Sequence, residues 1–343
     1  MKETILLGTY TKKESKGIYQ IELNHNTKKL ENLTLVTKVE NPTYLAENEG
    51  FLYAIDKYMN DGGVSVTDLA QKQTIQHVVK PGTPPAYITV NRKLNLVLDA
   101  NYHEGQLHAY NIQNNHELAL AHTFENQGSS VRPEQDGSHL HFVDFLPDGN
   151  LIACDLGTDQ VFIFSYDDKQ GFITKSIFST PAGFGPRHVT FTKDGKFIYL
   201  VGELASSVMV LEYKNNQLHT LQTISTIDNQ SKIKNGAAAI RISDDEKNLY
   251  VSNRGQDSLA VFKIKDNHTI ELIQSISVEG SFPRDFALNQ DNSYLVCANQ
   301  NSDNVTLFKR NSLNGKLTLI QKAVYAPEAV CVHFFSGGKN GKN

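Results

Sequence analysis

GPRHVTFTKDGKFIYLVGE, residues 185–203, is the stretch that decides the expected fold. Val189 and Phe191 alternate with threonines at the two-residue period of a half-buried strand. The Asp-Gly pair at 194–195 is a turn that commonly closes a two-stranded hairpin. Residues 197–201 are mainly aromatic and aliphatic, with β-branched members, as in a buried strand. The stretch therefore predicts a β-hairpin.

The same hairpin pattern recurs along the chain. Further copies are PTYLAENEGFLYAID from Pro42, PAYITVNRKLNLVLD from Pro85, HLHFVDFLPDGNLIACD from His139, AAIRISDDEKNLYVSNR from Ala238, PRDFALNQDNSYLVCANQ from Pro283 and, as a first strand alone, PEAVCVHF from Pro327. The copies begin about 48 residues apart. Two more strand-like segments follow each complete hairpin, so a unit has four short strands. This period and strand number are typical of a β-propeller blade.

The two ends of the chain complete each other. The N-terminal segments ILLGTY, GIYQIEL and LTLVTKV are three strands without a leading one, whereas PEAVCVHF leads no further strands. We expect pairing between the regions of Leu6 and Val330, which closes a seventh blade and removes exposed sheet edges. The predicted fold is an all-β, seven-bladed propeller with four antiparallel strands per blade. It forms one domain over 1–343, with a disordered tail at 336–343.

Composition narrows the classes of function. The chain has 343 residues, 39% hydrophobic and 20% charged, with a net charge of −4, which suits a soluble globular protein. This charge predicts neither a nucleic-acid nor a membrane partner. No apolar run reaches the roughly 20 residues that span a bilayer. Gly8 interrupts the apolar start of the chain, so we interpret that start as a strand and not as a signal peptide.

The cysteines and the absence of common catalytic motifs narrow the possible functions further. Cys154, Cys297 and Cys331 are far apart and have no metal-ligand spacing. We expect these cysteines to be buried free thiols in a protein of the reducing cytoplasm. We also expect a monomer or weak homodimer, and no cofactor. The sequence contains no G-x-S-x-G, P-loop, G-x-G-x-x-G or H-E-x-x-H motif, which disfavours serine-triad and nucleotide chemistry.

Candidate functional residues lie where the hairpin strands begin and end. The first strand of each propeller blade lines the central channel. Side chains with a purely structural role at these positions would be small and apolar. The polar side chains near these ends are His139, His141, Arg187, His188, Glu203, Arg254, Arg284 and Glu328. Three arginines beside one glutamate and a histidine suit an anionic substrate with a reacting carbonyl.

Several of these positions have alternative interpretations. His139 and His141 share one face of a strand, where they are half of a metal site or else catalytic, binding or structural imidazoles. Arg187 and His188 are adjacent and should point to opposite faces, so we expect Arg187 at the channel and His188 between blades. Glu203 either forms a structural bridge to Arg187 or works as an acid, a base or a ligand.

The chain also resembles the seven-bladed propeller lactonase family over nearly its whole length. The segments that carry the resemblance are GTYT (8–11), SKGIY (15–19), GSHLH (137–141), DLGTDQV (155–161), GPRH (185–188), LYVSNRGQDSLAVF (249–262), FPRDFAL (282–288) and ANQNSDNV (298–305). They occur in the family's order. The resemblance implies a metal-independent lactone site at the channel mouth, with the family's histidine, arginines and glutamate at His141, Arg187, Arg254 and Glu203.

What the resemblance implies about activity is specific. The family's best-known activity is that of 6-phosphogluconolactonase, in glucose metabolism by the pentose phosphate pathway, and a fungal relative closes a lactone ring on carboxymuconate. We expect hydrolysis of 6-phospho-D-glucono-1,5-lactone, with Glu203, His141 and Arg187 catalytic. Expected substrate contacts are Arg254, Arg284, His139, His188 and Glu328. The alternatives are another sugar-lactone or lactonising enzyme of this fold, or a propeller scaffold without chemistry.

Overall fold

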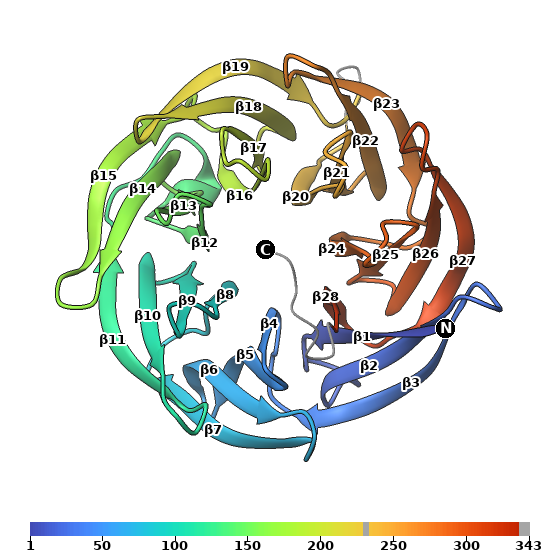
Figure 1. Ribbon diagram of the computed structural model, residues 1–343, viewed down its shortest axis with the longest axis horizontal. Helices are drawn as coiled ribbons and strands as arrows, with labels where there is room; N and C mark the ends of the chain where they lie inside the picture. Colours follow the sequence, from blue (N-terminus) through green and yellow to red (C-terminus); the bar gives the residue numbers. More distant parts are fainter. Residues whose placement is uncertain (229–232, 336–343) are drawn as a thin grey trace.

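Seven four-stranded sheets stand in a ring around a central channel in the computed structural model, which describes residues 1–228 and 233–335 (Figure 1). Neighbouring strands in every sheet are antiparallel. The predicted seven-bladed propeller is confirmed. Within the described ranges the only helix is one turn of 3-10 helix, η1 (Pro133–Gln135), and none is long and apolar enough to cross a membrane. The tail predicted to be disordered lies outside these ranges.

The blades are numbered here from 1 to 7 in the order of their innermost strands. These innermost strands are β4 (Leu45–Asn48), β8 (Tyr87–Asn91), β12 (Leu140–Phe145), β16 (Pro186–Phe191), β20 (Gly236–Ile242), β24 (Pro283–Leu288) and β28 (Ala329–Phe334). The second strands are β5 (Phe51–Tyr58), β9 (Leu96–Asn101), β13 (Leu151–Asp155), β17 (Phe197–Gly202), β21 (Asn248–Arg254), β25 (Tyr294–Asn299) and β1 (Lys2–Thr9). The third strands are β6 (Asp61–Asp68), β10 (Gln106–Ile112), β14 (Gln160–Asp167), β18 (Ser207–Lys214), β22 (Ser258–Ile264), β26 (Asn304–Arg310) and β2 (Gly17–Asn24). The outermost strands are β7 (Gln73–Lys80), β11 (Leu118–Glu125), β15 (Gly171–Ser179), β19 (Gln217–Ser225), β23 (Ile270–Ser277), β27 (Leu317–Tyr325) and β3 (Lys29–Lys38).

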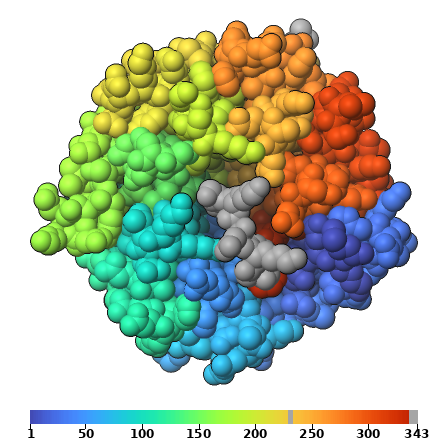
Figure 2. Space-filling view, in the orientation of Figure 1, coloured from blue at the N-terminus to red at the C-terminus, as the bar shows by residue number. Residues whose placement is uncertain are grey.

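Blade 7 is built from both ends of the chain, as predicted. In the β1–β28 pairing, Leu6 lies opposite His333 and Leu7 opposite Val332. In Figure 2 the dark-blue N-terminal strands lie between the lighter blue of blade 1 and the orange-red of blade 6. Pairing β28 with β1 satisfies backbone groups that would otherwise form open edges, so this contact closes the ring.

The hydrophobic core lies between the blades. The second strand of blade 4, β17, is buried from Ile198 onward because the neighbouring blades cover both of its faces. Tyr199 and Val201 of this strand pack in one cluster with Leu249 and Val251 of blade 5. The outermost strands instead carry mostly half-buried and exposed side chains. This difference explains why the second strands are continuous apolar runs in the sequence.

A break in strand register recurs at the start of the innermost strand in five consecutive blades, from blade 3 to blade 7. The breaks lie between Leu140 and Phe142, between Pro186 and His188, between Ala237 and Ile240, between Pro283 and Asp285, and between Ala329 and Cys331. Such a bulge inserts an extra residue and redirects its side chain. Simple alternation therefore fails at these positions.

The prediction that His188 packs between blades, away from Arg187, is wrong for this reason. Its ring contacts those of Tyr44, Tyr87 and His141, which belong to blades 1, 2 and 3. A terminal nitrogen of Arg187 lies 3.3 Å from Nε2 of His188. The bulge thus lets adjacent residues share one polar region at the channel.

Side chains from opposite blades meet inside the channel. Arg241 of blade 5 donates a hydrogen bond of 3.0 Å to the Tyr44 hydroxyl of blade 1 and one of 2.9 Å to Asp285 of blade 6. Tyr44 also packs on Tyr87, with ring centroids 4.4 Å apart. Because these contacts reach across the ring, they form a floor beneath the mouth where Arg187 and Glu203 lie.

Candidate active site

Glu203 lies between two arginines from neighbouring blades. It directly follows β17, and its Oε2 is 2.8 Å from Nε of Arg187 and 2.8 Å from a terminal nitrogen of Arg254. The Nε–H of Arg187 is not aimed at that oxygen, so this contact is an ion pair without a good hydrogen bond. The bridge to Arg187 therefore exists, and Arg254 adds a second one.

The start of β20 holds both guanidinium groups in place. Arg187 donates to the carbonyl of Ala238 at 2.9 Å, and Arg254 donates to the carbonyls of Ala237 at 3.2 Å and Gly236 at 3.3 Å. A Cβ on Gly236 would lie only 3.2 Å from the Arg254 side chain. Blade 5 has only glycine and alanine at 236–238, because the arginine side chains lie over the backbone there.

Burial and charge set the protonation of this ion cluster. Burial, followed by the charge of Arg254, lowers the pKa of Arg187 to about 9, so Arg187 remains protonated at pH 7. Burial alone would raise the pKa of Glu203, but the charges of Arg254 and Arg187 outweigh it and hold the pKa below its usual value. Two cations therefore surround one carboxylate at neutral pH.

Two buried histidines lie beside the cluster. The rings of His141 and His188 are 5.0 Å apart. Burial, and then the charge of Arg187, lower both pKa values well below the ordinary value, so both rings are neutral at pH 7. Since a guanidinium can only donate, Nε2 of His188 accepts from Arg187 and its proton resides on Nδ1. Among the described residues, neither Nδ1 has a hydrogen-bond partner.

Tyr102 forms the wall of the site on the side of blades 2 and 3. Its ring stacks on His139 with centroids 4.2 Å apart and meets the His141 ring edge-on at 5.7 Å. Nδ1 of His139 donates to the Tyr102 carbonyl at 2.9 Å, and Nε2 lies 3.0 Å from a carboxylate oxygen of Asp136. His139 is thus engaged in holding Tyr102, and the Tyr102 ring contacts both histidines.

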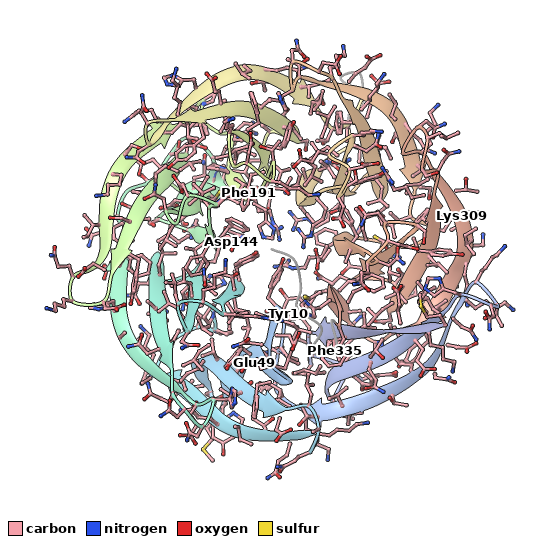
Figure 3. All side chains as sticks on the ribbon, viewed as in Figure 1. Tyr10, Glu49, Asp144, Phe191, Lys309 and Phe335 are labelled. Atoms are coloured by element: carbon pink, nitrogen blue, oxygen red, sulfur yellow. The ribbon has the colours of Figure 1, made fainter. Side chains whose placement is uncertain are left out.

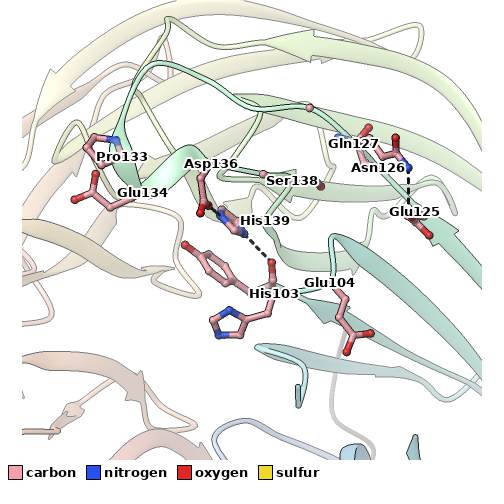
Figure 4. Close-up of a pocket in the computed structure, with 13 residues that line it drawn as sticks. His103, Glu104, Glu125, Asn126, Gln127, Pro133, Glu134, Asp136, Ser138 and His139 are labelled. Carbon is pink, nitrogen blue, oxygen red and sulfur yellow. Dashed lines mark hydrogen bonds and ion pairs between the residues drawn. The ribbon is translucent and has the colours of Figure 1, made fainter. Parts of the chain in front are cut away.

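An acidic pocket adjoins this wall (Figure 4). Its volume is about 750 Å³, and it opens to solvent. Its lining residues are Tyr102, His103, Glu104, Glu125, Asn126, Gln127, Gly128, Pro133, Glu134, Asp136, Gly137, Ser138 and His139. Four of them are carboxylates, so this side of the mouth is negative, whereas the side of blades 4 to 6 is positive.

Arg284 lies on the positive side. It occupies the bulge at the start of β24 and lies over the ring of Tyr10, with 5.7 Å between its guanidinium carbon and the ring centroid. Burial and Arg187 lower the pKa of His141, and the charge of Arg284 lowers it further. Burial raises the pKa of Glu203, and Arg284 helps Arg254 and Arg187 to lower it. The structure therefore brings Arg284 together with the predicted catalytic residues.

Glu328 has a different environment. Its side chain is buried, and its carboxylate accepts backbone hydrogen bonds from Lys12 and Lys13 at 2.9 Å and from Ser15 at 3.2 Å. These bonds attach the loop after β1 to the start of β28. Glu328 therefore has a structural role in blade 7, and we do not include it among the residues that contact substrate in our proposals.

One alternative for His139 and His141 is half of a metal site. Within residues 1–228 and 233–335, no group of three or more His, Cys, Asp or Glu side chains is placed to hold a metal ion. Asp155, the nearby carboxylate, accepts hydrogen bonds from the backbone of His139 and Gly157 and from the Ser138 hydroxyl. Those bonds order the loop that precedes β12.

Sequence reasoning missed three tyrosines of the site. Two of them directly follow a strand, Tyr10 after β1 and Tyr102 after β9, and Tyr44 directly precedes β4. Apolar and polar residues do not alternate regularly around these positions. The motif GTYT contains Tyr10, and Tyr44 is the third residue of the repeat that begins at Pro42. Comparing these equivalent positions across all blades is the signal that could have found them.

The fold and this site define a class: a seven-bladed propeller with a buried Arg-Glu-Arg cluster and neutral histidines at one channel mouth. A model of the family described as "Lactonase, 7-bladed beta-propeller" matches residues 4–334. The chain belongs to this family, which confirms the resemblance found in the sequence.

Individual relatives cover almost the whole chain. The 6-phosphogluconolactonase of Bacillus subtilis is 34% identical over 96% of this chain and 97% of its own. A crystal structure from Lactobacillus plantarum has 44% identity and a TM-score of 0.96, covering 98% of this chain and 100% of that one. The periplasmic gluconolactonase PpgL of Pseudomonas aeruginosa has 28% identity and a TM-score of 0.91, covering 98% and 99%. The chain is therefore similar to a hydrolase of lactones.

Proposed function

We propose that this protein hydrolyses 6-phospho-D-glucono-1,5-lactone to 6-phosphogluconate, a step of the pentose phosphate pathway. The observation that carries the proposal is the buried Arg187–Glu203–Arg254 cluster beside neutral His141. Membership of the lactonase family and the similarity to the Bacillus 6-phosphogluconolactonase support the reaction class. All residues of the site come from one chain, so we propose that a monomer is sufficient.

Glu203 is the proposed general base. Both arginines contact its Oε2, and the side chain keeps 21% exposure, so Oε1 remains available to a water molecule at the mouth. It is ionised at pH 7 because the arginines hold its pKa down. A carboxylate within hydrogen-bond reach of water can remove a proton as the oxygen attacks the carbonyl.

The steps balance as a simple ester hydrolysis. Water attacks C1 of the lactone while Glu203 takes one proton, which produces a tetrahedral oxyanion. The bond between C1 and the ring oxygen then breaks, and the released oxygen takes the proton back from Glu203 to become a hydroxyl. The new carboxylic acid releases its remaining proton to solvent and becomes the carboxylate of the product. Arg187 and Arg254 supply positive charge that stabilises the oxyanion. Neutral His141 accepts or donates a hydrogen bond at the substrate.

A second candidate is hydrolysis of a sugar lactone without phosphate. The observation that favours it is the similarity to the Pseudomonas protein, which is named a gluconolactonase. The acidic pocket beside Tyr102 also offers many acceptors for sugar hydroxyl groups. The same chemistry at C1 serves both substrates, so the difference between them rests on whether a phosphate is recognised.

The decisive experiment compares both lactones with purified protein. Initial rates are measured for 6-phosphogluconolactone and gluconolactone against the uncatalysed rate in buffer. The matched control is Glu271→Gln, because Glu271 is exposed on β23. We expect the Glu203→Gln protein to lose activity and the Glu271→Gln protein to keep it. If neither lactone is hydrolysed faster than in buffer, the protein is a scaffold and the proposal fails.

We also propose a cytoplasmic location. Cys154, Cys297 and Cys331 are all buried and free, as expected for a protein in a reducing compartment. The Pseudomonas relative is named periplasmic, so location needs its own test. Fractionation of cells should recover this protein with cytoplasmic markers, and recovery with periplasmic or secreted markers would contradict the proposal.

A further inference from the structure

We propose that Arg284, Tyr10 and Lys12 form the subsite that binds the anionic phosphate of the substrate, while the lactone ring faces Glu203 and His141. This inference deepens the proposed function and rests on it for the identity of the substrate. It assigns separate roles to arginines that the sequence treated together. The evidence consists of unpaired charge, the arrangement around one aromatic ring, the anchoring of a loop, and the charge of the opposite wall.

The first observation is that Arg284 is unpaired. Arg187 and Arg254 both contact Glu203 and backbone carbonyls. Among the residues that the structure describes, Arg284 has neither an ion-pair nor a hydrogen-bond partner. Its planar guanidinium has five N–H donors in a geometry that suits phosphate oxygens. An unpaired arginine at the edge of a buried, net-positive cluster is therefore a binding group for an anion.

The second observation is that two cations share the ring of Tyr10. The Lys12 ammonium lies 4.4 Å from the centroid of this ring, and the guanidinium carbon of Arg284 lies 5.7 Å from it. An aromatic face attracts a cation without using its hydrogen-bond donors. Tyr10 therefore holds both positive groups at one ring and leaves their N–H groups available. Figure 3 shows Tyr10 close to the central channel.

The third observation is that the loop carrying Tyr10 and Lys12 is anchored. The Tyr10 backbone N–H donates to the Glu328 carbonyl at 3.0 Å, and the Lys12 backbone N–H donates to the buried Glu328 carboxylate at 2.9 Å. Thr11 donates from its backbone to the Asn41 side chain at 3.2 Å. A loop held at three successive residues loses little conformational freedom when a ligand binds.

The fourth observation is the polarity of the mouth. The wall at Tyr102 adjoins carboxylates, among them Glu134 and Asp136, which would repel a phosphate. The opposite wall carries Arg284 and Lys12. A substrate with a phosphate at one end is therefore expected to bind with that end toward blades 6 and 7. This orientation leaves the carbonyl near the Arg187–Glu203–Arg254 cluster.

The test uses substrate pairs that differ only in phosphate. We expect Arg284→Gln to lower kcat/KM for 6-phosphogluconolactone about tenfold or more, because a charge-assisted bond is lost. The change for gluconolactone should stay within about twofold, since that substrate lacks the phosphate. Lys12→Gln should show the same selectivity with a smaller loss, because Lys12 is exposed. The matched control is Lys13→Gln, since Lys13 lies in the same loop but pairs with Asp303 at 3.8 Å.

A binding measurement separates this inference from the proposed reaction. Calorimetry with 6-phosphogluconate and gluconate should show tighter binding of the phosphorylated ligand, and Arg284→Gln should remove that preference. This result would support the subsite even if no lactone were hydrolysed. Equal losses on both lactones in Arg284→Gln would overturn the inference and assign Arg284 to the carbonyl centre. Arg284→Lys, which keeps the charge, should restore part of the preference if the protein is folded.

Discussion

Glu203 and Arg254 form an ion pair of 2.8 Å, although they belong to different blades. Glu203 directly follows the second strand of blade 4, and Arg254 is the last residue of the second strand of blade 5. The same oxygen of Glu203 also contacts Arg187. The channel mouth therefore brings the ends of neighbouring blades into one buried charge cluster. This cluster keeps one carboxylate ionised and in a fixed place, so that it can accept a proton from a water molecule at the mouth.

The first prediction concerns the base. Glu203→Gln should lower kcat about 100-fold or more on both lactones, because proton transfer is lost from a transition state that the two substrates share. Steady-state rates on the two lactones are the measurement. If this variant keeps the wild-type kcat, Glu203 is only an ion-pair partner, and His141→Gln becomes the variant that should lose activity.

The second prediction concerns metal. We expect lactone hydrolysis to survive treatment with EDTA, since His139 is engaged by Tyr102 and Asp136, and Asp155 is engaged by backbone amides. The measurement is the rate before and after chelation and dialysis. Loss of activity that a divalent ion restores would contradict the prediction and would direct attention to His141 and its neighbours.

The third prediction concerns pH and Asp144, which lies on β12 close to the channel (Figure 3). Burial raises the pKa of Asp144 to about 6, despite hydrogen bonds from the backbone of Phe145 and the hydroxyl of Thr89. The folded protein therefore holds a proton that the unfolded chain releases at lower pH. The stabilising effect of this proton is full below about pH 4 and is lost as the pH rises through about 6.

Asp144→Asn isolates this effect. As the pH rises from 4 to 7, the unfolding free energy of the wild type should fall by about 1–2 kcal/mol relative to that of Asp144→Asn. The expected change in free energy is smaller than the full pKa shift would give, because Asp144 is only half-buried and solvent screens its charge. Denaturant unfolding at several pH values is the measurement. A difference that does not vary with pH would show that Asp144 titrates normally.

The fourth prediction concerns Glu328. Glu328→Ala should lower the free energy of unfolding by about 2–4 kcal/mol, because three backbone N–H groups lose a charged acceptor. The loop that carries Tyr10 should also become more accessible to proteolysis. The matched control is Glu14→Ala in the same loop, where an exposed carboxylate accepts one bond from Tyr325. Equal stability of the two variants would show that the Glu328 contacts contribute nothing.

Much of the fold is visible in the sequence because it depends on local patterns. Hairpins of alternating and continuous apolar residues recur at a nearly constant interval, and the incomplete units at the two ends require each other. The pairing of β1 with β28 follows from that requirement, and the structure sets its register, with Leu6 opposite His333. The ring of polar positions at the strand ends follows from the same register, so it directed attention to Arg187, Glu203, Arg254 and His141.

The side-chain geometry of the site depends on tertiary structure. A bulge of one residue, which no local pattern marked, places His188 beside Arg187 and not between blades. Glu328 occupies an equivalent repeat position to Arg187, but the loop of another part of the chain binds its carboxylate. The sequence by itself determined the ring of blades and the residues near its mouth. Tertiary structure alone decided which of them share charge, because contacts across the ring join residues that are remote in the chain and a one-residue shift turns a side chain to the other face.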